Sequence, residues 1–361
     1  MSQKIVPRKL SFKPKPDYER IDKVLRRTGK PDRAPLFELF TNIQTDVLKR
    51  VYLPDEKIER HVSAMDARDE GYKDHIRYMY TLGYDYINMM ADNFAFPLNE
   101  MQHAQTNEGD RAYINAQSTT IANWQDFSQY RWPVMADVDY SRFERAPSFL
   151  PEGMKIIAWE SGVLENVMWL LGYEGISYWL ADDEQLVART FDAVGNRMVE
   201  YYDTVASYDC VGAIGMGEDM GFNTATMLAP ETYRKYLFPY HRQIVANAHR
   251  HGKPAFLHSC GNLKEIMGDV IGCGWDAKHS FEDSIEPVWE AQLKYGDRLA
   301  LLGGFDLDKL TRMSEAEVRQ HARFLIDTCG QNGGWAMGTG NSVPQYIPVD
   351  NFLAMVEENF R

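Results

Sequence analysis

One short stretch of the chain combines a histidine and a cysteine at a spacing that can hold a metal ion. His258 and Cys260 are separated by one residue, and Gly261 follows them and lets the backbone turn sharply. An imidazole nitrogen and a thiolate sulfur together suit zinc. The spacing is short and common, so an ordinary polar pair lining a loop is the alternative. A zinc site needs further ligands from elsewhere in the chain.

Other acidic and histidine residues are candidates for those ligands and for acid–base work. Glu282 is the best-placed carboxylate for the metal, with His279 as a competitor and Glu218 within reach across the site. Glu218 and Asp219 also suit proton transfer or ligation, although a solvated acidic loop explains them as well. Three protein ligands with one open position are typical of catalytic rather than structural zinc.

A further set of residues is suited to contacting a substrate or a cofactor. Glu160 directly follows an apolar run, where it either contacts a substrate or caps a helix. The glycine-rich segment 338–342 can cradle a phosphate through its backbone N–H groups, or pack closely around another ligand. We therefore predict two groups: catalytic residues Glu218, Asp219 and Glu160, and cofactor-contacting residues Asn341, Gly340 and His279.

The elements that must position these side chains are indicated by eight short apolar runs separated by helical stretches. The runs are 35–38, 86–90, 155–159, 211–215, 254–258, 276–280, 299–303 and 334–338. Strands that alternate with helices favour parallel strand–helix–strand units, and eight such units close most simply into a (β/α)8 TIM barrel. An open doubly wound sheet is the alternative. The candidate residues follow the carboxyl ends of the runs, where barrel active sites form.

Two segments stand outside this alternation. The spacing of apolar residues within 1–30 predicts a helical lead-in that plugs or flanks the barrel. Residues 98–132 are polar and contain a turn at 107–110, which predicts a hairpin inserted after the second strand. Because no Gly/Ser/Pro-rich linker divides the chain, residues 1–361 are expected to form a single barrel domain.

The composition predicts a globular protein and excludes some classes of binding partner. Hydrophobic residues make up 44% of the chain and charged residues 25%. A formal net charge of -13 argues against nucleic acid or an anionic membrane as a partner, since both need clustered Lys and Arg. The amino terminus has no apolar signal stretch, and no long apolar run follows. A cytoplasmic location and a small-molecule substrate are therefore expected.

The four cysteines differ in their places relative to the expected strands. Cys210 and Cys273 precede strands, and Cys329 ends a helix, which assigns them to the face opposite the active site. Only Cys260 lies just beyond a carboxyl end. Four cysteines in a chain of 361 residues are too few for a disulfide scaffold.

The stretch from Gly217 to Met355 resembles the uroporphyrinogen decarboxylase superfamily, and within it the corrinoid-dependent methyltransferase branch. The segments that carry the resemblance are LAPETY at 228–233, LHSCGNL at 257–263, GGFD at 303–306, and 333–355 with its paired glycines and two prolines. Looser matches occur at 33–35 and 165–169. The resemblance implies the barrel fold.

Members of that branch move a methyl group between a small molecule and a corrinoid cobalt, and hold zinc with a His-x-Cys pair and a later cysteine. The resemblance places His258 and Cys260 on that pair and Glu282 near a glutamate able to occupy the open site, and it aligns Asn341 with the later cysteine. It implies a zinc-assisted methyltransferase. Since the chain has no Asp-x-His-x-x-Gly segment, the corrinoid is expected on a separate partner protein. A homodimer is a further expectation.

Two other functions remain open at this point: a metal-free decarboxylase or lyase, and a non-catalytic protein that binds a corrinoid or tetrapyrrole. True uroporphyrinogen decarboxylases carry a pair of arginines shortly after the first strand. Here residues 37–42 contain no arginine, and Glu38 would face the substrate's carboxylates instead. This departure disfavours the decarboxylase.

Overall fold

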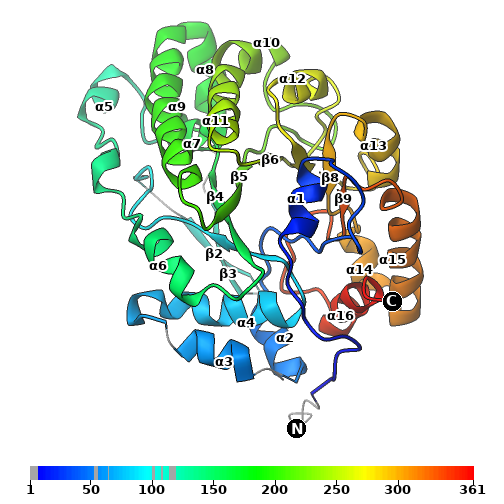
Figure 1. Ribbon diagram of the computed structural model, residues 1–361. Coiled ribbons are helices and arrows are strands. Elements are labelled where there is room, and N and C mark those ends of the chain that lie inside the picture. Colours follow the sequence, from blue (N-terminus) through cyan, green and yellow to red (C-terminus); the bar gives the residue numbers. More distant parts are fainter. Residues whose placement is uncertain (1–6, 53–55, 64, 100–101, 107–108, 114–118) are drawn as a thin grey trace.

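The computed structural model describes residues 7–52, 56–63, 65–99, 102–106, 109–113 and 119–361. At its centre is a curved sheet of seven strands with helices around it (Figure 1). The strands, in their order along the sheet, are β1 (Tyr86–Met89), β4 (Lys155–Ser161), β5 (Val211–Gly217), β6 (Ala255–His258), β7 (Ala277–His279), β8 (Ala300–Leu302) and β9 (Trp335–Ala336). All neighbouring pairs are parallel, so the carboxyl ends share one edge.

The expectation of eight strands is corrected to seven within the described part of the sheet. The first expected strand, 35–38, forms a parallel bridge between Leu36 and Met337 but no strand ladder. Toward β1 its hydrogen bonds are made by side chains. The Tyr86 hydroxyl bonds with both the N–H and the carbonyl of Glu38, each at 2.9 Å, and Asn88 Nδ2 donates to the same carbonyl at 3.2 Å. The segment is short and begins with a proline, which has no N–H to donate to a ladder.

Helices connect the strands and cover the outside of the sheet (Figure 1). None of the described helices combines the length and apolarity needed to span a bilayer. Before β4 the chain forms α1 (Glu19–Leu25), α2 (Gln44–Arg50), α3 (Glu56–Ser63), η1 (Ala67–Tyr72), α4 (Lys73–Thr81), α5 (Trp124–Gln129), η2 (Met135–Asp137) and α6 (Ser141–Phe149). After β4 it forms α7 (Val163–Leu171), α8 (Tyr173–Asp182), α9 (Glu184–Ala206), α10 (Pro230–Thr232), η3 (Tyr233–Leu237), α11 (Phe238–Arg250), α12 (Met267–Gly272), α13 (Val288–Tyr295), α14 (Leu307–Arg312), α15 (Glu315–Cys329) and α16 (Val349–Glu358).

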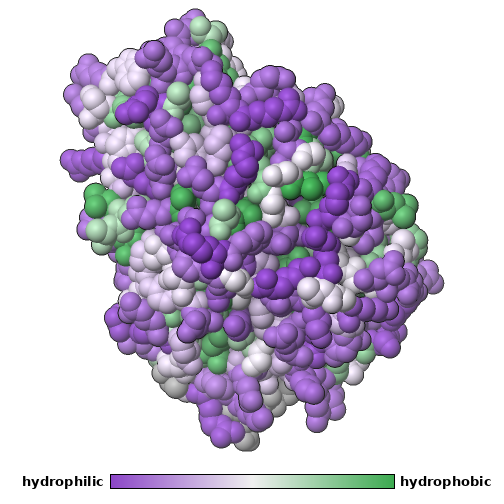
Figure 2. Space-filling view, turned by 45° about the horizontal axis from the view of Figure 1, so that its top comes forward, coloured by the Kyte–Doolittle hydropathy of each residue, from purple (hydrophilic) through white to green (hydrophobic). Residues whose placement is uncertain are grey.

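The core lies on both faces of the sheet. Strands β5, β6, β7 and β8 are buried along their whole length, as parallel strands covered by helices must be. Inside the curve, Phe256 packs edge-on against Phe37 at 5.2 Å between ring centroids, and Trp159 lies 6.0 Å from Phe256. The surface shown in Figure 2 is mostly hydrophilic, with apolar residues in small groups. Close packing of these rings holds the strand ends in fixed positions.

The described part of the lead-in lies across the amino ends of the strands. Tyr18 precedes α1 and packs on Gly212 in β5, where an added Cβ would lie 2.2 Å from the ring. Arg20 pairs at 2.9 Å with buried Asp85, directly before β1. The lead-in therefore covers the end of the sheet opposite the candidate site.

A separate antiparallel pair follows β1 in the chain. Strands β2 (Gln102–Thr106) and β3 (Gly109–Tyr113) pair with each other and not with the parallel sheet. The turn that we expected there includes residues 107–108, which lie outside the described residues.

Candidate metal centre and cavity

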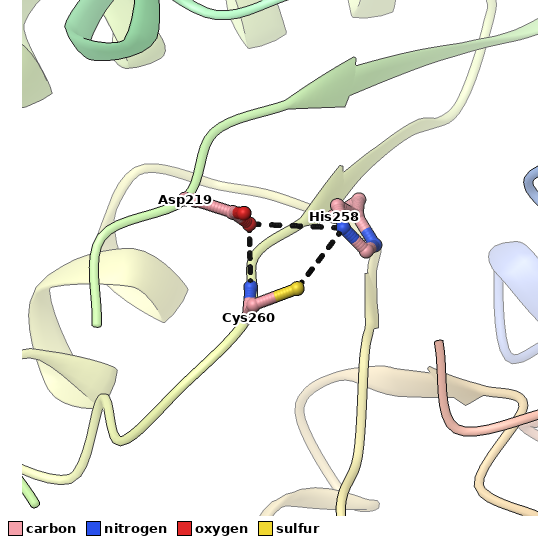
Figure 3. A group of neighbouring side chains, drawn as sticks. All are labelled: Asp219, His258 and Cys260. Carbon is pink, nitrogen blue, oxygen red and sulfur yellow. Dashed lines mark hydrogen bonds and ion pairs between the residues drawn. The ribbon is translucent and has the colours of Figure 1, made fainter. Parts of the chain in front are cut away.

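Three side chains that can bind a metal meet at the carboxyl ends of two neighbouring strands (Figure 3). His258 ends β6, Cys260 follows two residues later, and Asp219 lies just beyond β5. The Cys260 sulfur lies 3.4 Å from His258 Nε2, and Asp219 Oδ1 lies 3.7 Å from the same nitrogen. All three ligand atoms lie within 4.8 Å of one another.

These separations fit one tetrahedral zinc ion. Zinc bonds of ordinary length at tetrahedral angles separate an imidazole nitrogen from a sulfur by about 3.6 Å, and from a carboxylate oxygen by about 3.4 Å. The observed separations are 3.4 Å to Cys260 and 3.7 Å to Asp219. Because His258 also lines a cavity, a fourth position can remain open toward it. The donor set therefore suits zinc with one exchangeable site.

A close approach between two loops brings Asp219 to Cys260. The Cys260 N–H donates to Asp219 Oδ1 at 2.8 Å. Gly261 has a φ of 81°, and a Cβ added there would lie 2.1 Å from the carbonyl oxygen of Gly221. Only glycine allows this approach, so Gly261 determines where the loop after β6 meets the loop after β5.

His279 lies behind His258 and fixes its tautomer. The carbonyl of Thr339 can only accept, so His279 Nε2, which lies 3.1 Å from it, carries a hydrogen. Burial lowers the pKa of His258 to about 3 and that of His279 well below its usual value, so both rings are neutral. His279 Nδ1 must then accept from His258 Nδ1, 2.8 Å away. His258 Nε2 is left with a free lone pair facing Cys260 and Asp219.

Asn341 supports the sulfur of Cys260. Its Nδ2 donates to the Cys260 Sγ at 3.1 Å, while its Oδ1 accepts the N–H of Ser342 at 2.7 Å. Burial, and then the charge of Asp219, raise the pKa of the Cys260 thiol. A bound cation supplies the positive charge that a thiolate needs in such surroundings.

Glu218 lies in the core and not in the metal group. It is fully buried, and its oxygens accept the N–H groups of Val163 at 2.7 Å and Glu165 at 2.9 Å, at the start of α7. His241 Nε2 lies 3.2 Å from the same carboxyl group. A carboxylate at a helix N-terminus is a stabilising cap, so this position supports a structural role.

Glu282 and Gly340 lie near the metal group without contributing to it. Within the described residues, the group of ligand atoms within 4.8 Å does not include Glu282, although its charge contributes to the raised pKa of Cys260. The backbone of Gly340 is already bonded, because its N–H donates to Phe305 at 2.7 Å and its carbonyl accepts from Phe281 at 3.0 Å.

A cavity of about 880 Å³ lies beside His258. Much of its wall comes from the end of β4, from α7 and from the segment 90–98. The volume lies within the range of small-molecule sites. Most of the wall is apolar, and its aromatic members are Phe40, Phe94, Phe96, Trp159, Trp169 and Tyr173.

Glu160 and Glu165 bring carboxyl groups to this cavity. Burial raises the pKa of Glu160 to about 7, and burial together with the charges of nearby carboxylates raises that of Glu165 to about 8. Glu160 Oε1 accepts the N–H of Ser161 at 2.8 Å, but Oε2 is a buried oxygen without a hydrogen-bond partner among the described residues. Glu165 was missed as a site residue. The available signal was a lone charge within the apolar helix VLENVMWLL.

Residues 148–359 of the 361 match the protein family described as uroporphyrinogen decarboxylase (URO-D). The chain belongs to the uroporphyrinogen decarboxylase family. The family resemblance stated from the sequence is thereby confirmed. The matched region begins before β4 and includes Asp219, His258 and Cys260.

Members of this uroporphyrinogen decarboxylase family with different activities are similar to the chain. It is 25% identical over 188 residues to the methylated-thiol–coenzyme M methyltransferase of Methanosarcina mazei, covering 52% of this chain and 48% of the relative. It is 26% identical over 136 residues to a uroporphyrinogen decarboxylase of Carboxydothermus hydrogenoformans, covering 36% of each. The matches thus span about half or less of these relatives. A solved methyltransferase structure from Methanosarcina mazei shares the fold, with a TM-score of 0.66 at 14% identity over 94% of this chain and 97% of that one.

Proposed function

We propose that the protein is a corrinoid-dependent, zinc-assisted methyltransferase. It moves a methyl group between a small molecule and a corrinoid cobalt carried by a separate partner protein. The observation that carries this proposal is the group of His258 Nε2, Cys260 Sγ and Asp219 Oδ1 beside a substrate-sized cavity. The similarity to a methyltransferase within the same family supports it.

In this proposal His258, Cys260 and Asp219 hold zinc, and Asp219 takes the ligand position that the sequence analysis gave to Glu282. Bound zinc would act as a Lewis acid on an oxygen or sulfur of the methylated compound. His279 and Asn341 orient two of the ligands through the hydrogen bonds described above. Glu160 contacts the substrate from the cavity wall.

The cavity favours methyl transfer over decarboxylation of a porphyrinogen. A substrate with many carboxylates needs cationic partners, of which arginine is the strongest. The described lining of the cavity contains no lysine or arginine, whereas two glutamates belong to it. Glu38 is also fully buried where the decarboxylases carry their arginines. A carboxylate-rich tetrapyrrole would therefore lose its hydration without gaining a cationic partner from the described lining.

Metal analysis of a Cys260→Ser variant tests the centre. The wild-type protein is expected to bind about one zinc ion per chain. The variant should lose this zinc and all methyl transfer to or from a corrinoid, because a serine hydroxyl is a poor zinc ligand. Cys210→Ser is the matched control, since Cys210 lies outside the metal group and its thiol donates to the carbonyl of Phe143 at 3.3 Å, a bond that a hydroxyl makes equally well. Wild-type zinc content in Cys260→Ser would contradict the proposal.

A further inference from the structure

We infer that Tyr233 is a positioning residue for the metal centre: its hydroxyl fixes the loop that carries Asp219 and so holds the Asp219 carboxylate against Cys260. Tyr233 itself lies outside the group of metal-binding side chains. The inference adds a residue to the proposed function and rests on it, because Asp219 is a zinc ligand only in that proposal.

The loop that carries Asp219 is closed on itself. Beyond β5 the chain passes through Asp219, turns, and forms an isolated antiparallel bridge between Gly221 and Thr226. The Met227 N–H then donates to the Met220 carbonyl at 2.8 Å. The two ends of the loop therefore meet directly beside Asp219, and the groups that hold these ends determine where its carboxylate lies.

The Tyr233 hydroxyl bonds to both ends of this loop. It donates to the Met220 carbonyl at 2.8 Å and accepts the Leu228 N–H at 2.9 Å. The ring is buried and lies 6.0 Å from the ring of Phe238, between centroids, so the hydroxyl is held in one place. Tyr233 begins η3, a π-helical turn between α10 and α11. Such turns are rare and occur frequently at functional sites.

The backbone of Met220 is held from two sides. Its N–H donates to Ser259 Oγ at 3.2 Å, and its carbonyl accepts from Tyr233. Ser259 lies between two of the proposed ligands in the chain. Because Met220 directly follows Asp219, these bonds fix the direction in which the chain leaves Asp219, whose Oδ1 accepts the Cys260 N–H at 2.8 Å (Figure 3).

Burial alone does not hold the Asp219 side chain. It is 37% exposed, whereas the neighbouring Glu218 is fully buried and bonded to the start of α7. A partly exposed carboxylate keeps more freedom of rotation than a packed one. The place of the Asp219 carboxylate therefore depends on its backbone, and through that backbone on the Tyr233 hydroxyl.

Chelator competition on full-length Tyr233→Phe tests the inference. The variant keeps the ring and loses the hydroxyl, so zinc should bind about tenfold more weakly than to the wild type. Tyr201→Phe is the matched control. Tyr201 is also fully buried, and its hydroxyl likewise donates to a carbonyl, that of Trp159 at 3.0 Å, and accepts a backbone N–H, that of Ala91 at 3.2 Å. This control should keep wild-type zinc affinity while losing a similar amount of stability. Wild-type affinity in Tyr233→Phe, or an equal loss in both variants, overturns the inference.

Hydrogen exchange in the zinc-free protein gives a second readout that a merely structural role would not move. Exchange at the Cys260 amide should be about fivefold faster in Tyr233→Phe, because that N–H donates to Asp219 and the bond is weakened. The Glu218 amide donates to the His258 carbonyl at 2.9 Å, at the same strand ends, and should not change. An equal rise at both amides, or none at Cys260, overturns the inference.

The results separate this inference from the proposed function. Zinc retained in Cys260→Ser would contradict the proposed function, while the exchange measurement, which needs no metal, still tests whether the Tyr233 hydroxyl positions Asp219. Loss of zinc from Cys260→Ser, together with wild-type zinc affinity in Tyr233→Phe, would contradict only the inference about Tyr233.

Discussion

At the scale of single residues, the orientation of His258 depends on a neighbour that is not itself a ligand. His279 Nδ1 accepts a hydrogen bond from His258 Nδ1, and His279 Nε2 donates its hydrogen to the carbonyl of Thr339. Such a partner on the outer nitrogen of a ligating histidine fixes its orientation and raises its basicity. The sequence placed His279 at the site but could not show which of the two histidines faces Cys260 and Asp219.

Replacing His279 by leucine should therefore weaken zinc binding by about 10–100-fold. Chelator competition measures the affinity, and nitrogen NMR of the zinc-free protein should show that His258 populates both tautomers. His279→Asn should recover part of the affinity, since an amide oxygen near the former Nδ1 position can accept the same hydrogen. A folded leucine variant with wild-type affinity and a single His258 tautomer would rule out this role.

The pairing of His258 with Cys260 was predictable, because both lie at one strand end and their spacing is local. The choice of Asp219 over Glu218 and Glu282 as the proposed third ligand was not. It depends on the contact between the loops at Gly261 and Gly221, which are 40 residues apart in the chain. It also depends on Glu218 being turned inward to cap α7.

At the scale of elements, the apolar runs predicted every strand of the parallel sheet, but not how the first run joins it. That run ends in Glu38, whose carboxyl group bonds with the Thr339 N–H at 2.9 Å and with the Thr339 hydroxyl. It therefore ties the segment 35–38 to the loop after β9. The spacing of apolar residues along the sequence indicates which residues are buried. The contact of segment 35–38 with the sheet is made by one backbone bridge and by side chains, and such a contact leaves no regular pattern in the sequence.

Glu38 should make the stability of this join depend on pH. Burial raises its pKa to about 8, against 4.5 without burial, so the folded chain keeps a proton that the unfolded chain releases as the pH rises from about 5 to 8. Stability from this group falls over that range. Glu38→Gln retains the shape and the donor of the protonated acid and should remove the loss. Urea unfolding at pH 5.5 and 8.5 should differ between the two proteins by roughly 3 kcal/mol; an identical pH dependence would disprove the assignment.

At the scale of the whole molecule, the proposed metal joins segments that are distant in the chain. Asp219 and Cys260 belong to loops after β5 and β6, and Asn341, which bonds to Cys260, belongs to the loop after β9. A ligand that binds only the folded chain stabilises all of it by mass action. Metal binding should therefore be visible in global unfolding.

Thermal unfolding with added zinc tests this coupling. Zinc at about 100 times its dissociation constant stabilises a folded protein by about 2.7 kcal/mol. For a chain of 361 residues the melting temperature should rise by roughly 4 °C. The rise should be absent in Cys260→Ser and retained in Cys210→Ser. A similar rise in all three proteins would mean that zinc binds elsewhere.

The way segment 35–38 joins the sheet also affects how the size of the cavity can change during evolution. Leu39 and Phe40 extend from that join into the cavity wall, and in the described structure no ladder of backbone bonds ties their segment to β1. Substitutions that shift these two side chains need not disturb the register of any strand. Relatives can thus evolve wider or narrower cavities at this position while the metal-binding loops keep their geometry.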